Sequence, residues 1–333
     1  MILNNNNVLL KKGFVDAEID KDIDIAAEIV RLRKEKNAVI LAHYYQEGSI
    51  QDIADYVGDS LFLSQKAAST KADMIVFCGV HFMAETAKIL SPQKKVLLPD
   101  LNAGCSLADS CRSDGFEDFL RDYPDHTVIS YVNTTAEIKA LSDIICTSSN
   151  AVQIVNSLPE ATKIIFAPDR NLGNYIEAIT GRKMVIWNGA CHVHEEFSLE
   201  KILDLKNKYP DSKIIAHPEC RQPILIVADY IGSTSALLNF VKTDQGKTYI
   251  VATESGILHQ MRKACPEKEF LAAPPKDSTC GCSDCNFMKL NTMEKLYNCI
   301  KFELPEILVP EELRSKAEKS IRRMLEISEN LGL

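Results

Sequence analysis

The sequence predicts an α/β protein made of three homologous αβα sandwich domains, each with a small parallel sheet. The first observation is that residues 213–235, 38–60 and 127–149 are alike: each begins with an apolar run that ends in polar residues. The second is that the segment after each copy also repeats, as apolar strand, helical pattern, turn, apolar strand and then cysteine. Repetition at so long a period defines the architecture before any local assignment is made. Alternating strand and helix patterns predict parallel sheets of about four strands, with helices on both faces.

The repeats set the expected domains. We assign residues 1–123 to an N-terminal arm and the first repeat, 124–209 to the second repeat, 210–304 to the third, and 305–333 to a helical tail. An amphipathic helix is expected at residues 25–36, and Pro310 with Glu311 opens the helix of the tail. Short second strands are expected in the sequences ADYVGD, SDIICT and ADYIGS.

Composition narrows the class of protein. The net charge is −8 and no run of Lys or Arg occurs, which argues against a nucleic-acid partner. No apolar run is long enough to span a membrane, and the N-terminus lacks the features of a signal peptide, so we expect a cytoplasmic protein without a membrane partner. Eleven cysteines in such a chain indicate metal-binding or catalytic roles rather than a disulfide framework.

Polar residues follow the first strand of each repeat. Ligands of open parallel sheets gather at the carboxyl ends of the strands, so we expect a shared site there. Glu219 beside His217 is a candidate base, although a solvated glutamate is the simpler alternative. His192 and His194 closely follow Cys191. The strand-end residues are His43 and Tyr45, Tyr131 and Asn133, and His217 and Glu219.

A hydroxyl residue precedes a helical pattern in each repeat: Ser60, Ser148 and Thr234. Serine and threonine are favoured N-caps, so three helix caps are one interpretation. Three helix N-termini directed at one centre would also bind carboxylate or phosphate groups, which is the functional interpretation.

The cysteines suggest a metal centre. Cys105, Cys191 and the group Cys280, Cys282 and Cys285 each follow the last strand of a repeat. One thiolate from each repeat would hold a [4Fe-4S] cluster and leave one iron open, because such clusters normally have four thiolate ligands. A zinc site or a redox-active pair within the last group are the alternatives. The remaining cysteines are assigned to packing or to no role: Cys78, Cys111, Cys146, Cys220, Cys265 and Cys299.

The assembled motifs resemble those of the quinolinate synthase family of iron–sulfur enzymes. The resemblance covers residues 38–292 and rests on motifs such as QDIADYVGDS, LLPDLNAGCSLAD, NGACHVHEEF, AHPEC and CNFMKLNT. It implies three domains around a pseudo-threefold axis with one cluster per chain at the centre. Its ligands carry over to Cys105, Cys191 and Cys285. Spacing alone favours Cys280 over Cys285, but the family pattern around CNFMKLNT singles out Cys285.

The resemblance implies that iminoaspartate and dihydroxyacetone phosphate condense to quinolinate, phosphate and water, in NAD biosynthesis. An aspartate-oxidising enzyme is the expected source of iminoaspartate. We expect Glu219, helped by His217, to move protons, and Tyr45 and His192 to assist near the cluster. Tyr131 is also expected to be catalytic. Substrate groups are expected to bind at His43, Tyr45, Tyr131, Asn133, His217, Glu219, Ser60, Ser148, Ser233 and Thr234.

Three alternatives stay open at this point. An iron–sulfur hydro-lyase acting on a hydroxy acid would use the same open iron but has no need of a phosphate site. A non-enzymatic iron–sulfur sensor would have no need of the aligned residues at the strand ends. A zinc-stabilised binding module would contain zinc instead of iron and sulfide.

Overall fold

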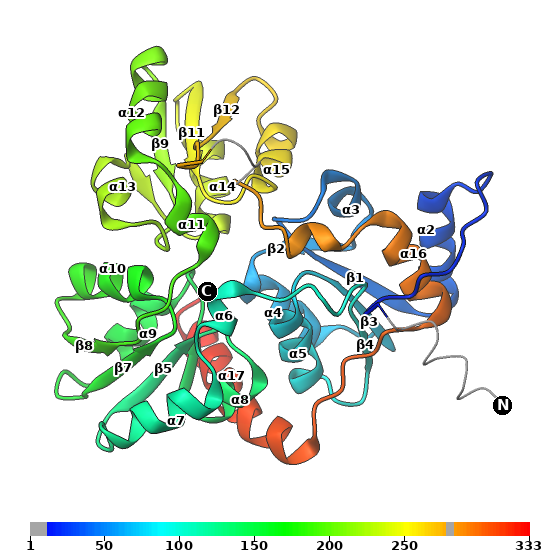
Figure 1. The fold of residues 1–333 in the computed structure, drawn as a ribbon, viewed down its shortest axis with the longest axis horizontal. Helices are drawn as coiled ribbons and strands as arrows, with labels where there is room; N and C mark the ends of the chain where they lie inside the picture. Colours follow the sequence, from blue (N-terminus) through cyan, green and yellow to red (C-terminus); the bar gives the residue numbers. More distant parts are fainter. Residues whose placement is uncertain (1–11, 278–282) are drawn as a thin grey trace. The chain divides into compact units, whose positions relative to one another are not determined.

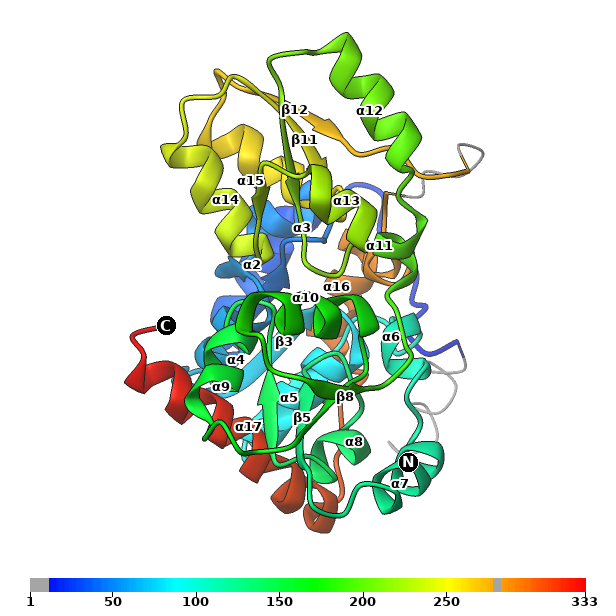
Figure 2. The same ribbon diagram turned by 90° about the vertical axis from the view of Figure 1, so that its left-hand side faces the viewer.

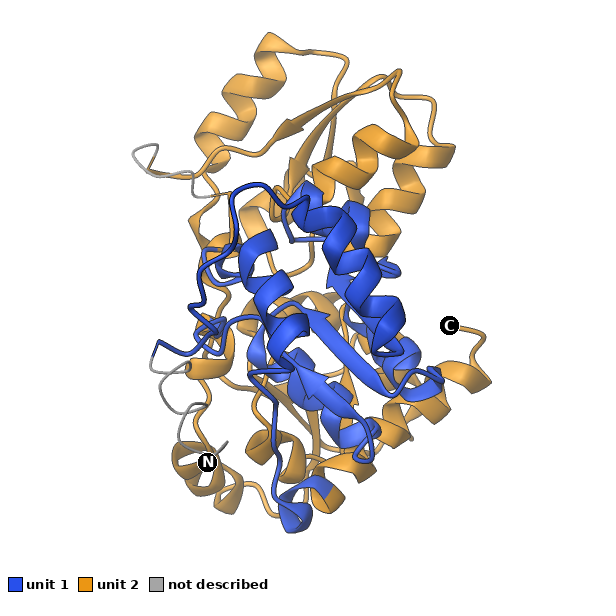
Figure 3. Ribbon diagram, turned by 90° about the vertical axis from the view of Figure 1, so that its right-hand side faces the viewer, with its two compact units in different colours: residues 1–105, 286–314 blue, residues 106–285, 315–333 orange. Residues whose placement is uncertain are grey.

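The fold is that of a computed structural model, which describes residues 12–277 and 283–333 (Figure 1). The chain divides into two compact units, and each is described by itself. The first unit comprises residues 1–105 and 286–314, and the second comprises residues 106–285 and 315–333 (Figure 3). The boundaries expected at residues 123, 209 and 304 stay a prediction. Cys280 and Cys282 lie outside the described residues.

The first unit contains one parallel four-stranded sheet of order β2-β1-β3-β4. Helices α2 and α16 pack against each other, and their apolar residues join those of β1 and β3 in one core cluster. The helix expected at residues 25–36 is therefore confirmed as α2, which is capped by Asp24. The elements are α2 (Ile25–Glu35), β1 (Ala38–His43), α3 (Gly48–Ile53), β2 (Tyr56–Gly58), α4 (Ser60–Ser69), β3 (Met74–Cys78), α5 (His81–Leu90), β4 (Lys95–Leu97), the 3₁₀-helix η1 (Met288–Leu290) and α16 (Met293–Phe302).

The second unit contains two more parallel sheets with the same strand order, β6-β5-β7-β8 and β10-β9-β11-β12. The three matching sheets confirm the predicted α/β class. The elements of the second sheet and its surroundings are α6 (Ser106–Asp109), α7 (Ser113–Arg121), β5 (Thr127–Tyr131), α8 (Ala136–Ala140), β6 (Ile144–Cys146), α9 (Ala151–Ser157), β7 (Ile164–Ala167), α10 (Arg170–Thr180) and β8 (Met184–Ile186).

The third sheet has helices on both faces, with α14 and α15 side by side on one face and α12 and α13 on the other (Figure 2). The expected terminal helix is confirmed as α17 (Glu311–Asn330). No helix in the described part of the chain is both long and apolar enough to cross a membrane. The remaining elements are α11 (His192–Glu196), α12 (Leu199–Lys208), β9 (Lys213–Ala216), α13 (Gln222–Val227), β10 (Tyr230–Ile231), α14 (Thr234–Thr243), β11 (Thr248–Ala252), α15 (Ile257–Ala264) and β12 (Glu269–Ala272).

A repeated aspartate ties the first two strands of each sheet together. Its carboxylate accepts a hydrogen bond of 2.8 Å from a backbone N–H of the first strand, and its own N–H donates to the carbonyl of the same residue. These bonds satisfy backbone groups at the start of the short second strand. The aspartate is therefore repeated for a structural reason. The pairs are Asp55 with Ile40, Asp143 with Val128, and Asp229 with Ile214.

The interpretation of Ser60, Ser148 and Thr234 as helix caps is wrong. Asp59 caps α4 and accepts from the N–H of Phe62, so Ser60 is the first helical residue. Helix α9 begins after Asn150, two residues beyond Ser148. Ser233 caps α14, so Thr234 is its first helical residue. Asp59 and Ser233 each stand one position before the residue interpreted as the cap, and both are favourable capping residues. The sequence alone therefore does not tell which of the two neighbouring residues caps α4 or α14.

Candidate active site

The core of the site in the second unit is a buried carboxylate, Glu219, in the loop after β9. Tyr131 ends β5 in the neighbouring sheet, and its hydroxyl donates a hydrogen bond of 2.5 Å to Glu219 Oε1. Both side chains are buried. The carboxyl ends of the first strands of these two sheets thus contribute adjacent polar groups, as parallel-sheet topology leads one to expect.

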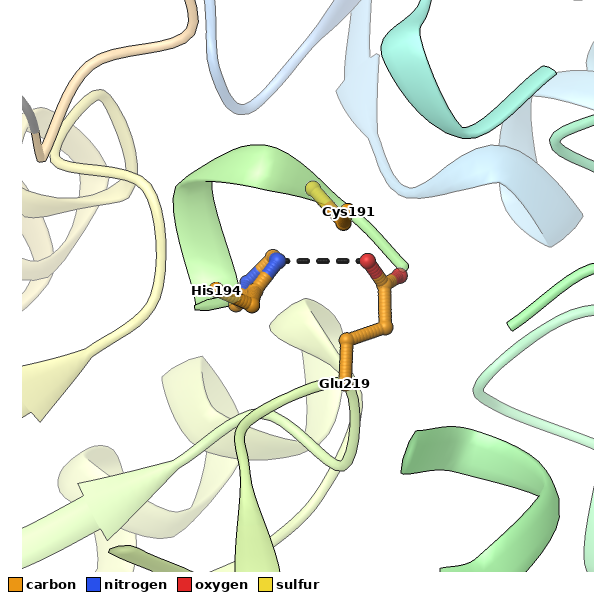
Figure 4. Close-up of side chains that lie close together, drawn as sticks. All are labelled: Cys191, His194 and Glu219. Carbon is orange, nitrogen blue, oxygen red and sulfur yellow. Dashed lines mark ion pairs between the residues drawn. The ribbon is translucent and has the colours of Figure 1, made fainter. Parts of the chain in front are cut away.

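Two histidines face the same carboxylate. His194 Nδ1 lies 3.1 Å from Glu219 Oε2 (Figure 4), and His217 Nδ1 lies 3.7 Å from Oε1. The two imidazole rings stack with centroids 4.8 Å apart. Thr253 Oγ1 lies 3.0 Å from His194 Nε2 and fixes the ring from its other side. Sequence reasoning noted His194 but gave it no role, and the only signal was its place three residues after Cys191.

The surroundings of Glu219 determine its charge. Burial alone would raise the pKa of this carboxyl, but His194, His217 and the hydrogen bond from Tyr131 together lower it to about 2. Glu219 is therefore ionised throughout the neutral range. Asp169 behaves in the opposite way: burial and the charge of Glu219 raise its pKa well above the usual value.

His192 begins α11, directly after Cys191, and is held by a serine. Ser106 Oγ lies 2.8 Å from His192 Nδ1 and 3.4 Å from the backbone nitrogen of the same residue. Burial and the charge of His194 lower the pKa of His192. At neutral pH the imidazole is therefore uncharged, and the serine hydroxyl orients it.

The loops that carry Cys191 and Cys285 are anchored in the same way. The N–H of Cys191 donates to Asp169 Oδ2 at 3.2 Å, and the N–H of Cys285 donates to Glu254 Oε1 at 3.1 Å. Asp169 and Glu254 are fully buried, and each lies two residues beyond the end of the third strand of its sheet, β7 or β11. The equivalence of Asp169 and Glu254 was not predicted from the sequence, because the second repeat has an aspartate where the third has a glutamate.

Within the second unit, two segments that carry hydroxyl residues are in contact. Ser149 donates to Ser233 Oγ at 2.8 Å, which links the segments that enter α9 and α14. Ser233 and Thr234 are buried, whereas Ser148, which directly precedes Ser149 in the sequence, is partly exposed. Asn133 is partly exposed in the loop after β5.

The first unit holds the remaining predicted residues. His43 ends β1 and is buried, and its Nδ1 accepts a hydrogen bond of 3.2 Å from the N–H of Tyr45. The third sheet repeats this turn, because the N–H of Glu219 lies 3.3 Å from His217 Nδ1. Ser60 opens α4, and Cys105 follows β4 as the last residue of this part of the unit.

The donor atoms in the second unit are suited to a metal. One ligand atom each from Cys191, His194 and Glu219 lies within 4.8 Å of the others (Figure 4). Among the nine cysteines that the structure describes, six are buried, and the three that are partly exposed are Cys105, Cys191 and Cys285. These are the three thiols that the family resemblance implies as ligands of an iron–sulfur cluster. A thiol that must reach an added group cannot be sealed in the core, so the residues present fit such a group.

Chemical modification tests this difference among the thiols. In native protein stripped of metal, iodoacetamide should label Cys105, Cys191 and Cys285 and leave Cys78, Cys111 and Cys146 unlabelled. Burial raises the pKa of Cys111 to about 12 and that of the other two further, so little thiolate forms. Mass spectrometry of peptides gives the labelled fraction, with unfolded protein as the control. Equal labelling of Cys105 and Cys78 would contradict the assignment.

Comparisons with a family model and with individual proteins all identify the same family of enzymes. A family model described as "Quinolinate synthetase A protein" matches residues 27–326. The protein named quinolinate synthase from Thermosynechococcus vestitus is 62% identical over 306 residues, which is 92% of this chain and 96% of that protein. The one from Synechocystis is 62% identical over 92% of this chain and 96% of its own length. The one from Chloroherpeton thalassium is 56% identical over 94% of this chain and 99% of its own length.

Proposed function

The chain belongs to the quinolinate synthetase A family of enzymes, and on that premise we propose that it condenses iminoaspartate with dihydroxyacetone phosphate to give quinolinate, phosphate and water. An aspartate-oxidising enzyme would supply iminoaspartate in the same compartment, which we take to be the cytoplasm. Membership of a family of enzymes favours this proposal over an iron–sulfur sensor or a zinc-stabilised module.

We assign the proton transfers to Glu219. It is ionised at neutral pH and can accept a proton at once, but a carboxylate whose pKa is near 2 is a weak base. Substrates that carry carboxylate and phosphate groups bring negative charge, which raises the pKa of a nearby carboxyl toward the useful range. Tyr131 donates its hydroxyl proton to Glu219 and can relay protons, while His217, 3.7 Å from the carboxylate, would help by stabilising its charged form.

We assign substrate binding to the other residues at the strand and helix ends. We propose that His43, Tyr45 and Asn133 donate or accept hydrogen bonds to substrate groups, and that His192 and Tyr45 assist close to the metal centre. The hydroxyl residues would bind the carboxylate and phosphate groups together with the N–H groups of the helix starts. These residues are Ser60, Ser148, Ser233 and Thr234.

We propose that Cys105, Cys191 and Cys285 hold one [4Fe-4S] cluster per chain. When bound, the cluster would supply an open iron that acts as a Lewis acid toward a substrate oxygen. Asp169 and Glu254 hold the backbone of two of these cysteines in place.

The observation that best supports the proposal is the buried group of Tyr131, His194, His217 and Glu219 in a chain of this family. It is tested by incubating anaerobically purified protein with both substrates and measuring quinolinate by chromatography. Formation of quinolinate that depends on both substrates supports the proposal. Release of phosphate without quinolinate, or dehydration of a hydroxy acid instead, would overturn it.

A further inference from the structure

A buried lysine holds the loop that presents Tyr131 and Asn133. Lys139 lies on α8, and its side chain is 0% exposed. Its Nζ donates to the carbonyl oxygen of Val132 at 2.9 Å and to that of Thr134. Those two carbonyls lie on either side of Asn133. The lysine therefore fixes the backbone on both sides of a residue that we assign to substrate binding.

A glutamine makes the same two bonds in the first unit. Gln51 lies on α3 and is 2% exposed. Its Nε2 donates to the carbonyl oxygen of Tyr44 at 2.9 Å and to that of Gln46 at 2.8 Å. These carbonyls lie on either side of Tyr45, the counterpart of Asn133. Lys139 follows Gln51 by 88 residues, as Tyr131 follows His43 by 88 residues, so the two side chains occupy equivalent positions.

The third sheet does without this arrangement. Leu225 is the residue at the equivalent position, 86 residues after Lys139, as His217 is 86 residues after Tyr131. A leucine side chain cannot donate a hydrogen bond. There Glu219 is held by its contacts to Tyr131 and His194 instead.

Lys139 and Gln51 differ in charge but make the same pattern of hydrogen bonds, so we infer that the geometry of these bonds is what matters. Lysine is almost never fully buried unless its ammonium group is paired, because removing that group from water is costly. In the first unit the neutral amide of Gln51 makes the corresponding two hydrogen bonds. What the two residues share is a long side chain with a nitrogen that donates two hydrogen bonds to backbone carbonyls two residues apart.

We propose that Lys139 and Gln51 are positioning residues that fix the two strand-end loops in the geometry needed to hold the substrates. This inference rests on the proposed function for the roles of Tyr131, Asn133, His43 and Tyr45. It adds two residues on helices, neither of which was among the site residues predicted from the sequence.

The test compares two replacements of Lys139. Lys139→Met keeps much of the side chain but cannot donate, so we expect kcat/KM for quinolinate formation to fall about 100-fold, as small misplacements of reacting groups can do. Lys139→Gln supplies the donor that Gln51 supplies in the first unit, so it should keep kcat/KM within about threefold of wild type. Leu225→Met is the matched control, since it places the same methionine at the equivalent position of the third sheet.

Hydrogen exchange measures the loop itself, independently of turnover. In Lys139→Met the amides of residues 132–135 should exchange at least about tenfold faster than in wild type, while those of β7 stay unchanged. Lys139→Gln should leave both sets unchanged. Gln51→Leu and Gln51→Lys should give the corresponding loss and rescue for residues 44–47. Together these results support the inference.

Two results would overturn it. One is wild-type kcat/KM and exchange in Lys139→Met. The other is a Lys139→Gln variant as impaired as Lys139→Met, which would mean that the charge of Lys139 is required. If wild-type protein forms no quinolinate, the proposed function fails, while the exchange data still decide whether the lysine and the glutamine hold their loops.

Discussion

Replacement of Glu219 by glutamine should lower quinolinate formation by about 1,000-fold, within the range expected for loss of a general acid–base group. Glutamine has the same shape and can still accept the hydrogen bond from Tyr131, but it cannot take up a proton. The cluster should be retained, because Glu219 is not among its proposed ligands. The measurement is kcat for quinolinate together with the visible absorbance of the anaerobic protein.

The control for this change is Glu196→Gln, a partly exposed glutamate on α11 whose carboxylate lies 3.8 Å from Lys276 Nζ. Loss of a surface ion pair of this kind has little effect on stability, so the control should keep full activity. Turnover of Glu219→Gln within tenfold of wild type would remove Glu219 from the mechanism. Loss of the cluster together with activity would instead indicate a role in holding the metal centre.

Replacement of Cys285 by serine should abolish the cluster, whereas replacement of Cys280 should not. Iron and acid-labile sulfide should fall from about four of each per chain to nearly none in Cys285→Ser, because two remaining thiolates hold a cube poorly. Cys220→Ser is a further control: this thiol is buried and donates to the carbonyl of Ala252, so it should not affect the iron content.

The opposite effect of the Cys280 and Cys285 replacements on iron content would identify Cys280 as the ligand. If Cys280→Ser lost iron and Cys285→Ser kept it, the regular spacing of the repeats would have identified the ligand correctly and the motif around Cys285 would have misled. Cys285 is partly exposed, and its backbone is anchored to Glu254, which favours the motif.

The sequence predicted the fold because each repeat contains its own local signals. The apolar runs, the helical patterns and the short second strands recur in register, and the three matching sheets follow from them. The repeated aspartates Asp55, Asp143 and Asp229 were visible in the same alignment, but their function was not. Only the backbone geometry shows that each one joins the first two strands.

The site was harder to predict where it depends on contacts between repeats. Tyr131 and Glu219 were found because both stand at equivalent strand ends, yet their hydrogen bond joins two different sheets. His194 has no counterpart in the other repeats, and its contact with Glu219 is visible only in the structure. The starts of α4 and α14 were misplaced by one residue, because Asp59 and Ser233 are favourable caps, as are the residues that follow them. Helix α9 begins two residues later than expected, after Asn150.

We propose that one thiol from each third of the chain holds a single iron–sulfur cube. Metal and sulfide analysis of anaerobically purified wild-type protein tests it most directly. We expect about four irons and about four sulfides per chain, in brown protein whose colour is lost on exposure to air. Colourless protein with one zinc per chain and no sulfide would contradict the claim.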